Sequence, residues 1–392
     1  MRNFSSILVT LVLWVAGLCA AAQFAKMGLF LPELQQLYPE AGVATGFLIT
    51  LISLVGALLG LVAGILVGRI GARSVLLGGL LIGALISLVQ SIYLPLSLLL
   101  ASRMVEGFSH LAIVVAAPTL MSRYCSERLS AVAMTLWGTF FGVSFALTAS
   151  LGLPLVETQG IHVLFLAHAL ILSVTTALVA LLVPKQRAVS NDETRSHQSD
   201  SIASLFQRHK QAWLSPYIAA PAAGWLFYTT TFVALLAILP SLMPLDQRAF
   251  VASAMPLASI FSSMTLGAAL LLRFSAVHVV NIGFIAALSL ALLFLIGTYE
   301  ALICVLLFSA LGLVQGASFA AIPQLNTTAS KQALAYGALA QAGNIGNLCG
   351  TPLLLFLINY GGTKAMIALV VTCYTMAICA HLSFDRRRKC RI

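Results

Sequence analysis

The chain has 392 residues, of which 60% are hydrophobic and only 8% are charged, and its mean hydropathy is +1.02. Soluble domains usually carry about 25% charged residues, so this composition excludes an ordinary soluble enzyme and indicates a polytopic membrane protein. The formal net charge is +10, and where those charges lie decides whether they indicate a nucleic-acid partner.

Apolar runs long enough to cross a bilayer, about 20 residues each, recur along the whole chain. We identify twelve of them, at 6–31, 43–67, 75–92, 95–121, 130–154, 162–183, 216–240, 248–272, 277–297, 300–323, 333–358 and 363–384. A long polar segment at 184–215 separates six spans from six. We therefore predict an all-α membrane protein with a six-helix bundle at 1–183, a flexible linker at 184–215, and a second six-helix bundle with a basic tail at 216–392.

Lys and Arg concentrate in alternate loops. Of the 21 Lys and Arg residues, seventeen fall on one side of this topology, and only Arg248 and Lys364 fall on the other. Because cytoplasmic loops are enriched in Lys and Arg, we expect both termini and the linker to be cytoplasmic. The basic charge is then a topology signal, and no nucleic-acid partner is predicted. The short loops favour a bacterial inner (plasma) membrane.

The span at 95–121 carries three ionisable residues, in Arg103-Met-Val-Glu106-Gly107-Phe-Ser-His110. At 100° per residue, Glu106 and His110 return to within about 60° of Arg103, so a cation, a carboxylate and an imidazole share one helix face. Charged side chains at this depth are costly and indicate a functional site by default. The alternative is an ion pair that only ties helices together.

In the first span, Lys26 and Gln23 also share one face. Lys26 lies about 8 Å from the outer end, so its ammonium either joins Arg103 at the same depth or snorkels to the interface. With Glu106 ionised, the three charged residues net +1, which favours an anion or the carboxylate of a zwitterion. Glu106 is the only acidic residue well inside a span, and we predict that it couples proton movement beside Arg103. His110 either relays a proton or packs.

The second half offers aromatic and amide side chains in its spans in place of charges. Such groups orient a ligand in a mostly apolar pocket, although amides also bond helices to one another. The residues that we predict to contact substrate are Trp225, Tyr228, Gln315, Gln341 and Asn344. The halves also look related, because an offset of about 204 residues lays Arg69 on Arg273 and Gly142 on Gly346. Two repeats in the same orientation predict a substrate path at their interface.

Across essentially its whole length the chain resembles the major facilitator superfamily. The loop Gly-Ile-Leu-Val-Gly-Arg-Ile-Gly-Ala-Arg at 64–73 is similar to the signature loop of that family, and the resemblance implies conformational gating by Arg69, Gly71 and Arg73. Gly68 stands where the family usually has an acid. Arg103-Met-Val-Glu106-Gly107 is similar to the family's buried Arg-x-x-Gln/Glu-Gly motif, often linked with proton coupling.

The resemblance further implies that spans one and four line a central cavity. This would bring together Gln23, Lys26, Arg103, Glu106 and His110. Gly138-Thr-Phe-Phe-Gly142 is similar to the family's antiporter motif, but Val143 stands where drug antiporters usually have proline. The cyanate-transporter-like and drug-antiporter-like branches both remain open.

We therefore expect a secondary transporter that moves a small organic anion or zwitterion by alternating access, coupled to protons and acting as a monomer in the bilayer. One alternative is a proton-driven efflux carrier for hydrophobic drugs or metabolites; a more remote one is a membrane-embedded enzyme or sensor. The chain has no P-loop and no hydrolase or protease signature, so no enzymatic activity is predicted. The seven cysteines lack metal-ligand spacing, and neither a metal nor a cofactor is expected.

Overall fold

The structure, a computed structural model, describes residues 2–40, 47–125, 127–184, 202–297 and 300–390, and every regular element in these ranges is helical. The helices of the first half are α1 (Arg2–Gly28), α2 (Leu31–Leu37), α3 (Phe47–Ile70), α4 (Ala72–Gln90), α5 (Leu96–Tyr124), α6 (Glu127–Gly138), α7 (Phe140–Leu147), the π-helical turn η2 (Thr148–Gly152), α8 (Leu153–Gln159) and α9 (Ile161–Leu182). Those of the second half are α10 (Ile202–Leu214), α11 (Ala219–Leu242), α12 (Leu245–Ser262), the π-helical turn η4 (Ser263–Gly267), α13 (Ala268–Leu271), α14 (Ala276–Phe294), α15 (Glu300–Leu325) and α16 (Ala329–Lys389).

The predicted membrane-spanning fold is confirmed. In the described ranges, 11 helical segments are long and apolar enough to cross a bilayer. One of them is the end of α16, a 61-residue element that contains two crossing helices, because Gly362 interrupts it at φ 68°. Glycine adopts this left-handed conformation without strain, which allows the chain to reverse there without a loop. With the first part of α16, which packs against α3, the described residues hold twelve helical segments of crossing length.

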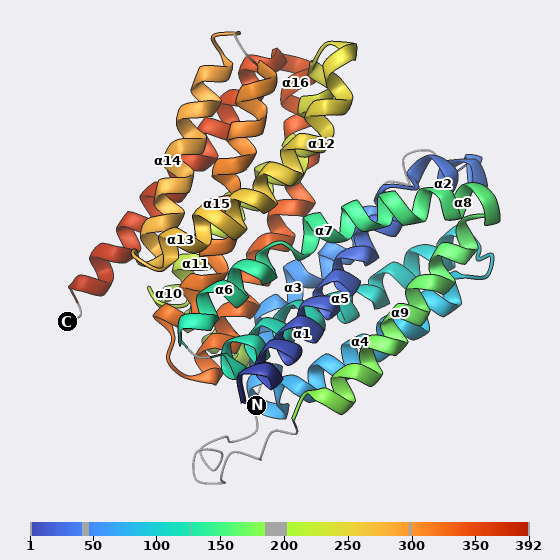
Figure 1. The fold of residues 1–392 in the computed structure, drawn as a ribbon, viewed down its shortest axis with the longest axis horizontal. Coiled ribbons are helices and arrows are strands. Elements are labelled where there is room, and N and C mark those ends of the chain that lie inside the picture. The colour runs from blue at the N-terminus through green and yellow to red at the C-terminus, as the bar shows by residue number, and fades with distance from the viewer. Residues whose placement is uncertain (1, 41–46, 126, 185–201, 298–299, 391–392) are drawn as a thin grey trace.

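The crossing helices form two bundles, one from α1 to α9 and one from α11 to α16 (Figure 1). We call the end of the molecule that carries the loop 69–73 and the tail 386–389 the basic side, and the end that carries Pro95 and Gly160 the opposite side. Figure 1 shows the bundles close together near the N-terminus and α10, and spreading apart toward α2, α8 and the far end of α12.

Glycines allow the two bundles to meet toward the basic side. A Cβ added at Gly60 on α3 would lie 2.6 Å from the backbone nitrogen of Gln341, and one added at Gly337 would lie 2.6 Å from the carbonyl oxygen of Gly60. On the other flank, a Cβ on Gly138 would lie 3.3 Å from the Cα of Gly316. The helix pairs α3 with α16 and α6 with α15 therefore pack nearly backbone to backbone, as small residues permit.

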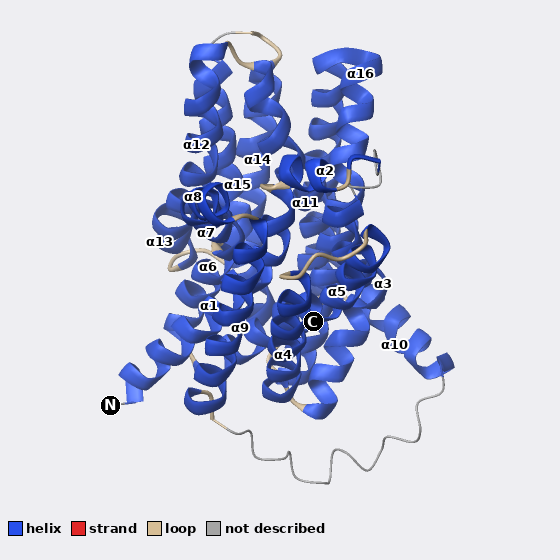
Figure 2. Ribbon diagram, turned by 90° about the vertical axis from the view of Figure 1, so that its right-hand side faces the viewer, coloured by secondary structure: helices blue, strands red, loops and turns tan. Residues whose placement is uncertain are grey.

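A helix, α10, lies inside the interval predicted as a flexible linker. Figure 2 shows it beside the bundles, at the end that also carries the N-terminus. Nε1 of Trp213 donates to Oε1 of Gln341 at 3.2 Å, and Nη2 of Arg387 donates to the carbonyl of Leu214 at 3.1 Å. The interval is therefore not without regular structure at 202–214, while 185–201 lie outside the described residues, and its flexibility as a linker stays a prediction. The limits of the two bundles as domains stay a prediction.

Candidate functional site

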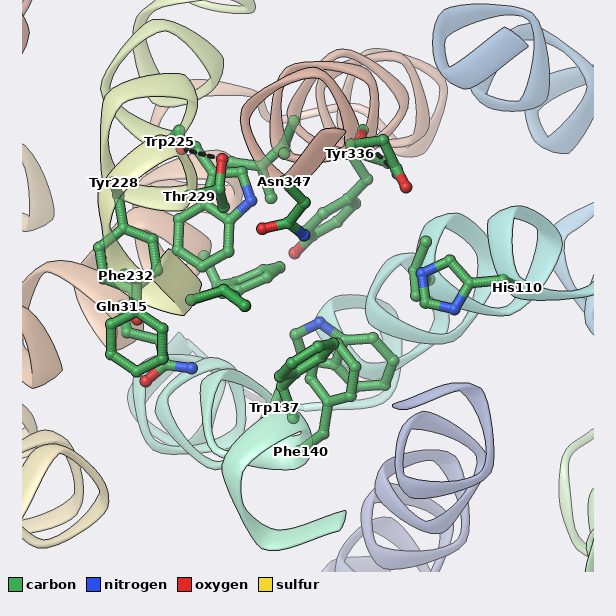
Figure 3. Close-up of a pocket in the computed structure, with 18 of the residues that line it drawn as sticks. His110, Trp137, Phe140, Trp225, Tyr228, Thr229, Phe232, Gln315, Tyr336 and Asn347 are labelled. Carbon is green, nitrogen blue, oxygen red and sulfur yellow. Dashed lines mark hydrogen bonds between the residues drawn. The ribbon is translucent and has the colours of Figure 1, made fainter. Parts of the chain in front are cut away.

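A cavity of about 90 Å³ lies between the two bundles and is walled mainly by aromatic rings (Figure 3). Nine aromatic side chains line it. The first bundle supplies Phe24, Trp137, Phe140 and Phe141, and the second supplies Trp225, Tyr228, Phe232, Phe319 and Tyr336. Figure 3 shows His110, Trp137 and Phe140 facing Trp225, Tyr228 and Tyr336 across the space. We call this space the central cavity.

The rings of the second bundle brace one another. The ring centroids of Trp225 and Tyr228 are 4.5 Å apart with 18° between their planes, and Phe319 meets Trp225 edge-on at 5.0 Å. Gly343 makes room for the indole, since an added Cβ would lie 2.6 Å from Nε1 of Trp225. Rings held in offset-stacked and edge-on pairs form a flat, pre-formed apolar wall.

A few uncharged polar groups complete the wall. They are His110, Thr229, Gln315, Asn344 and Asn347, and none of the described lining residues is Asp, Glu, Lys or Arg. Nδ1 of His110 lies 3.0 Å from the carbonyl of Ala20, which fixes the ring. Oδ1 of Asn347 is buried with no partner among the described atoms. The cavity therefore offers hydrogen bonds without formal charge.

The charged residues lie elsewhere, inside the first bundle. The side chains of Lys26, Arg103 and Glu106 are at most 1% exposed. Nζ of Lys26 lies 2.5 Å from Oε1 of Glu106, while Nη1 of Arg103 donates to Oε2 of the same carboxylate. One acid thus pairs with two cations, and we call these three residues the ion triad. Buried charges persist only when they are paired and hydrogen-bonded in this way.

Polar side chains from α4 and α9 surround the ion triad. Nζ of Lys26 donates to Oγ of Ser87 and to Oε1 of Gln90, each at 2.7 Å, and Nε2 of Gln90 donates to Oε2 of Glu106 at 2.9 Å. Nδ1 of His168 lies 3.3 Å from the ammonium of Lys26, and its Nε2 lies 3.0 Å from the carbonyl of Cys19. A neutral imidazole that accepts at Nδ1 and donates at Nε2 fits both contacts.

The predicted substrate residues fall into two groups in this geometry. His110, Trp225, Tyr228, Gln315 and Asn344 line the central cavity. The remaining four, Gln23, Lys26, Arg103 and Gln341, do not line it.

Three of those four are engaged inside the first bundle. Lys26 and Arg103 belong to the ion triad, and Nε2 of Gln23 donates to Oγ of Ser109 at 2.8 Å. Gln341 instead joins the bundles, because its Nε2 donates to the carbonyl of Ala57 at 2.9 Å. The carboxylate of Glu106, predicted to couple protons, is fully buried beside Arg103.

The loop predicted to gate lies at the basic side. Gly71 precedes α4 at φ 91°, and Arg73 donates from Nε and Nη2 to the carbonyls of Val183 and Ala180 at 2.8 and 2.7 Å. Arg73 therefore fastens α4 to the end of α9 within one bundle. The exposed Arg69 follows Gly68, where an added Cβ would lie 3.4 Å from Oγ of Ser330 on α16. This loop thus approaches the second bundle at Gly68.

Sequence reasoning missed two sets of residues. The rings of Trp137, Phe140 and Phe319 carry no signal that separates a cavity wall from core packing. Ser87 and Gln90 do carry a sequence signal, because they are polar residues three positions apart on one face of an otherwise apolar span.

Two helical bundles with a central cavity between them are the arrangement found in secondary transporters. The family profile of the Major Facilitator Superfamily matches residues 13–351, and the chain belongs to this family, whose members are transporters and not enzymes. The predicted resemblance is confirmed.

The similar proteins are also transporters. The inner membrane transport protein YajR of Escherichia coli is 27% identical over 199 residues, which span 50% of this chain and 42% of YajR, less than half of that relative. The transporter FucP, in its outward conformation, superposes with a TM-score of 0.72 at 17% identity, over 97% of this chain and 99% of FucP. The human organic anion transporter MFSD10 gives 0.74 at 15% identity, over 96% and 99% of the two chains. The two structures show the fold alone.

Proposed function

We propose that this transporter moves a small, uncharged and mostly apolar solute that carries one or a few hydrogen-bonding groups. The observation that supports this is the wall of the central cavity, which combines nine aromatic rings with amide, hydroxyl and imidazole groups. Ligand pockets of this composition bury apolar surface and use a few polar groups for orientation. A charged solute would lose its hydration there without meeting an opposite charge.

The sequence had favoured an anion or a zwitterion because of Lys26 and Arg103. Both cations are paired with Glu106 in the structure, which weakens that argument. A weak organic anion is the second candidate, and one observation favours it. The ion triad nets +1, and Glu106 lies one helical turn from His110, which lines the cavity. The electric field of the ion triad reaches the central cavity from one helical turn away, where it attracts a negative solute and repels a cation.

We also propose that transport is coupled to protons through Glu106. Protonation would change the charge of the ion triad from +1 to +2 and remove the anion that holds Lys26 to Arg103. Support comes from the burial of this carboxylate inside the first bundle and from its place one turn from the central cavity. FucP and XylE, which share the fold, are named as proton symporters of fucose and xylose.

We place the protein in the bacterial inner membrane as a monomer, with both termini in the cytoplasm. The distribution of Lys and Arg supports this orientation, as does the inner-membrane relative YajR. The basic side, where the bundles meet, would then face the cytoplasm. Reporter fusions at both ends test the orientation, and an active periplasmic reporter at either end would contradict it.

Binding of three simple probes to the detergent-purified protein tests the substrate class. We expect the neutral indole to raise the melting temperature, because a ligand at one hundred times its Kd adds about 2.7 kcal/mol. Benzoate and tetraphenylphosphonium should not raise it. Trp225→Ala should abolish the indole effect, whereas Phe250→Ala, at a ring exposed outside the central cavity, should leave it.

Each other pattern has a definite meaning. Stabilisation by benzoate but not indole would replace the first candidate with the anion. Stabilisation by tetraphenylphosphonium alone would contradict both candidates. For coupling, Glu106→Gln proteoliposomes should no longer accumulate the bound probe under a pH gradient, and accumulation at the wild-type level would refute a role for this carboxylate.

A further inference from the structure

A second cavity, of about 270 Å³, opens inside the first bundle at the opposite side and shares no residue with the central cavity. Its wall comes from α2, from the turn between α4 and α5, and from the start of α9. Leu34, Leu94, Leu99 and Ile161 make it partly apolar, while Ser91, Tyr93 and His162 add polar groups. We call it the vestibule.

The floor of the vestibule touches the ion triad. Gln90 lines the vestibule and is only 3% exposed. Its Oε1 accepts from Nζ of Lys26 at 2.7 Å, and its Nε2 donates to Oε2 of Glu106 at 2.9 Å. Phe165, a second wall residue, has its ring centroid 5.4 Å from the ammonium of Lys26. One amide side chain therefore lies directly between the vestibule and both charges.

The vestibule has the size and the polar groups that water requires. A water molecule occupies about 30 Å³ in the liquid and needs two to four polar partners. The hydroxyl of Tyr38 donates to the carbonyl of Leu94 at 2.6 Å, and the ring of Tyr38 stacks on Tyr93 at 5.9 Å. Burial raises the pKa of Tyr38, so this hydroxyl keeps its proton and stays a donor. These contacts hold the rim of the vestibule in place.

We propose that the vestibule is the water-filled entry through which protons from the opposite side reach Glu106, with Gln90 as its gate and with a path separate from that of the substrate. This deepens the proposed coupling and rests on it. A hydronium ion in the vestibule gives its proton to the carboxylate of Glu106 and becomes water. The new O–H bond neutralises the acid, and its contacts with Lys26 and Arg103 weaken.

One competing proton acceptor lies beside Glu106, the neutral imidazole of His168. Facing Glu106 are Lys26 from α1, Arg103 from its own helix and His168 from α9, while α4 contributes the uncharged Ser87 and Gln90. The backbone carbonyl of Leu48 on α3 accepts from Nε of Arg103 at 2.7 Å. His110, one turn along α5, faces the central cavity and not the vestibule.

Thiol labelling along α4 tests access to water. Ser91→Cys, at the vestibule wall, should react with a membrane-impermeant thiosulfonate, and the unmodified chain measures the background from native cysteines. Ser87→Cys, one turn deeper beside Lys26, should react only when Gln90→Ala is also present. Leu88→Cys, on the lipid-facing side of the same helix, is the matched control and should stay unlabelled. A Ser91→Cys chain that reacts only after denaturation would overturn the proposal.

The rate at which Glu106 gains its proton tests the route. The infrared carbonyl band of the protonated carboxyl group, identified by its loss in Glu106→Gln, is followed after an acid jump in detergent-purified protein. Ser91→Trp and Ile92→Trp should slow its appearance about tenfold or more without changing its final height. Leu88→Trp is the control and should leave the rate unchanged. Ile92 is 64% exposed, so its substitution carries little risk to folding.

The outcomes separate the two proposals. A band that appears at the wild-type rate in both plugged variants would overturn the vestibule route and leave the coupling role of Glu106 intact. A band that never forms at acid pH would show that Glu106 does not take a proton, and both proposals would then fail. A slower band in both plugged variants, with Leu88→Trp unchanged, is the expected result.

Discussion

The ammonium of Lys26 and the carboxylate of Glu106 lie 2.5 Å apart in the interior of the first bundle, and neither side chain is more than 1% exposed. Arg103 shares the same carboxylate, so the single acid satisfies two cations. Neutralising each of the three residues therefore has a different effect on the charge left in the interior. Loss of the acid leaves two like charges in the interior, whereas loss of Lys26 leaves a neutral pair.

We therefore expect Glu106→Gln to lower stability more than Lys26→Met does. Breaking a buried ion pair so that a charge is left unpaired costs about 3–5 kcal/mol, and the acid variant leaves two such charges. Lys26→Met keeps the pair of Arg103 with Glu106 and should cost less. Melting temperatures of the purified variants in one detergent measure the difference. A Lys26→Met protein at least as unstable as Glu106→Gln would show that the triad does not behave as one acid with two cations.

Gly343→Ala should weaken binding in the central cavity. The added methyl group would lie 2.6 Å from Nε1 of Trp225, so the ring of Trp225 has to shift into the space that the ligand occupies. We expect an affinity for indole lower by about tenfold, or about 1.4 kcal/mol, with the protein still folded. Gly28→Ala, where an added Cβ meets nothing within 4 Å, is the control. Equal affinities in the two variants would contradict the position assigned to the ligand.

Gly337→Val should force the bundles apart at the basic side. Its side chain would occupy the place of the Gly60 backbone, and close packing does not accommodate such an insertion without a shift. In a chain without native cysteines, spin labels at Ile70→Cys and Lys331→Cys should report a longer distance. Gly78→Val serves as the control because nothing lies within 4 Å of an added Cβ there. An unchanged distance distribution would mean that the contact between Gly337 and Gly60 does not hold the two bundles together at the basic side.

Trp213→Phe should loosen α10. The substitution removes the donor to Gln341 and leaves an aromatic ring of similar shape, so the expected loss is about 1 kcal/mol of local stability. Faster amide hydrogen exchange within Ile202–Leu214 measures it. Gln341→Leu removes the acceptor and should produce the same increase. If only one of the two variants exchanges faster, the bond between them is not what holds the helix.

The twelve spans and the pairing of Arg103 with Glu106 followed from the sequence, because both depend on local rules. Span length is set by the bilayer, and a spacing of three residues fixes two side chains on one helix face. The contact of Lys26 with Glu106 depends on which helices are neighbours in space. The periodicity of apolar residues along the chain carries no information about that. The same limit applies to the central cavity. His110 is rotated by about 40° from Glu106 around α5 and reaches a different space.

Composition did not reveal the helix within the predicted linker. Its polar residues indicated a flexible segment, yet α10 forms where apolar residues recur at helical spacing near its end, and Ala212 is buried there. The break of the fifth span into α6, α7, the turn η2 and α8 had no sequence signal that we recognise. Two of the nine rings of the aromatic wall, Trp225 and Tyr228, were predicted from their place in a span with Thr229, whereas the other seven were not.

The chain reversal at Gly362 has a mechanical consequence. Because no loop separates the two crossing helices of α16, they form a single bent lever. Its first arm carries Gly337, which meets the first bundle, and its second arm ends near Arg387, whose Nη2 donates to the carbonyl of Leu214 at the end of the linker. A tilt of the first arm relative to the second must therefore occur at or near Gly362. The tilt is either taken up as torsion at one backbone position or delivered to the linker on the same side of the membrane.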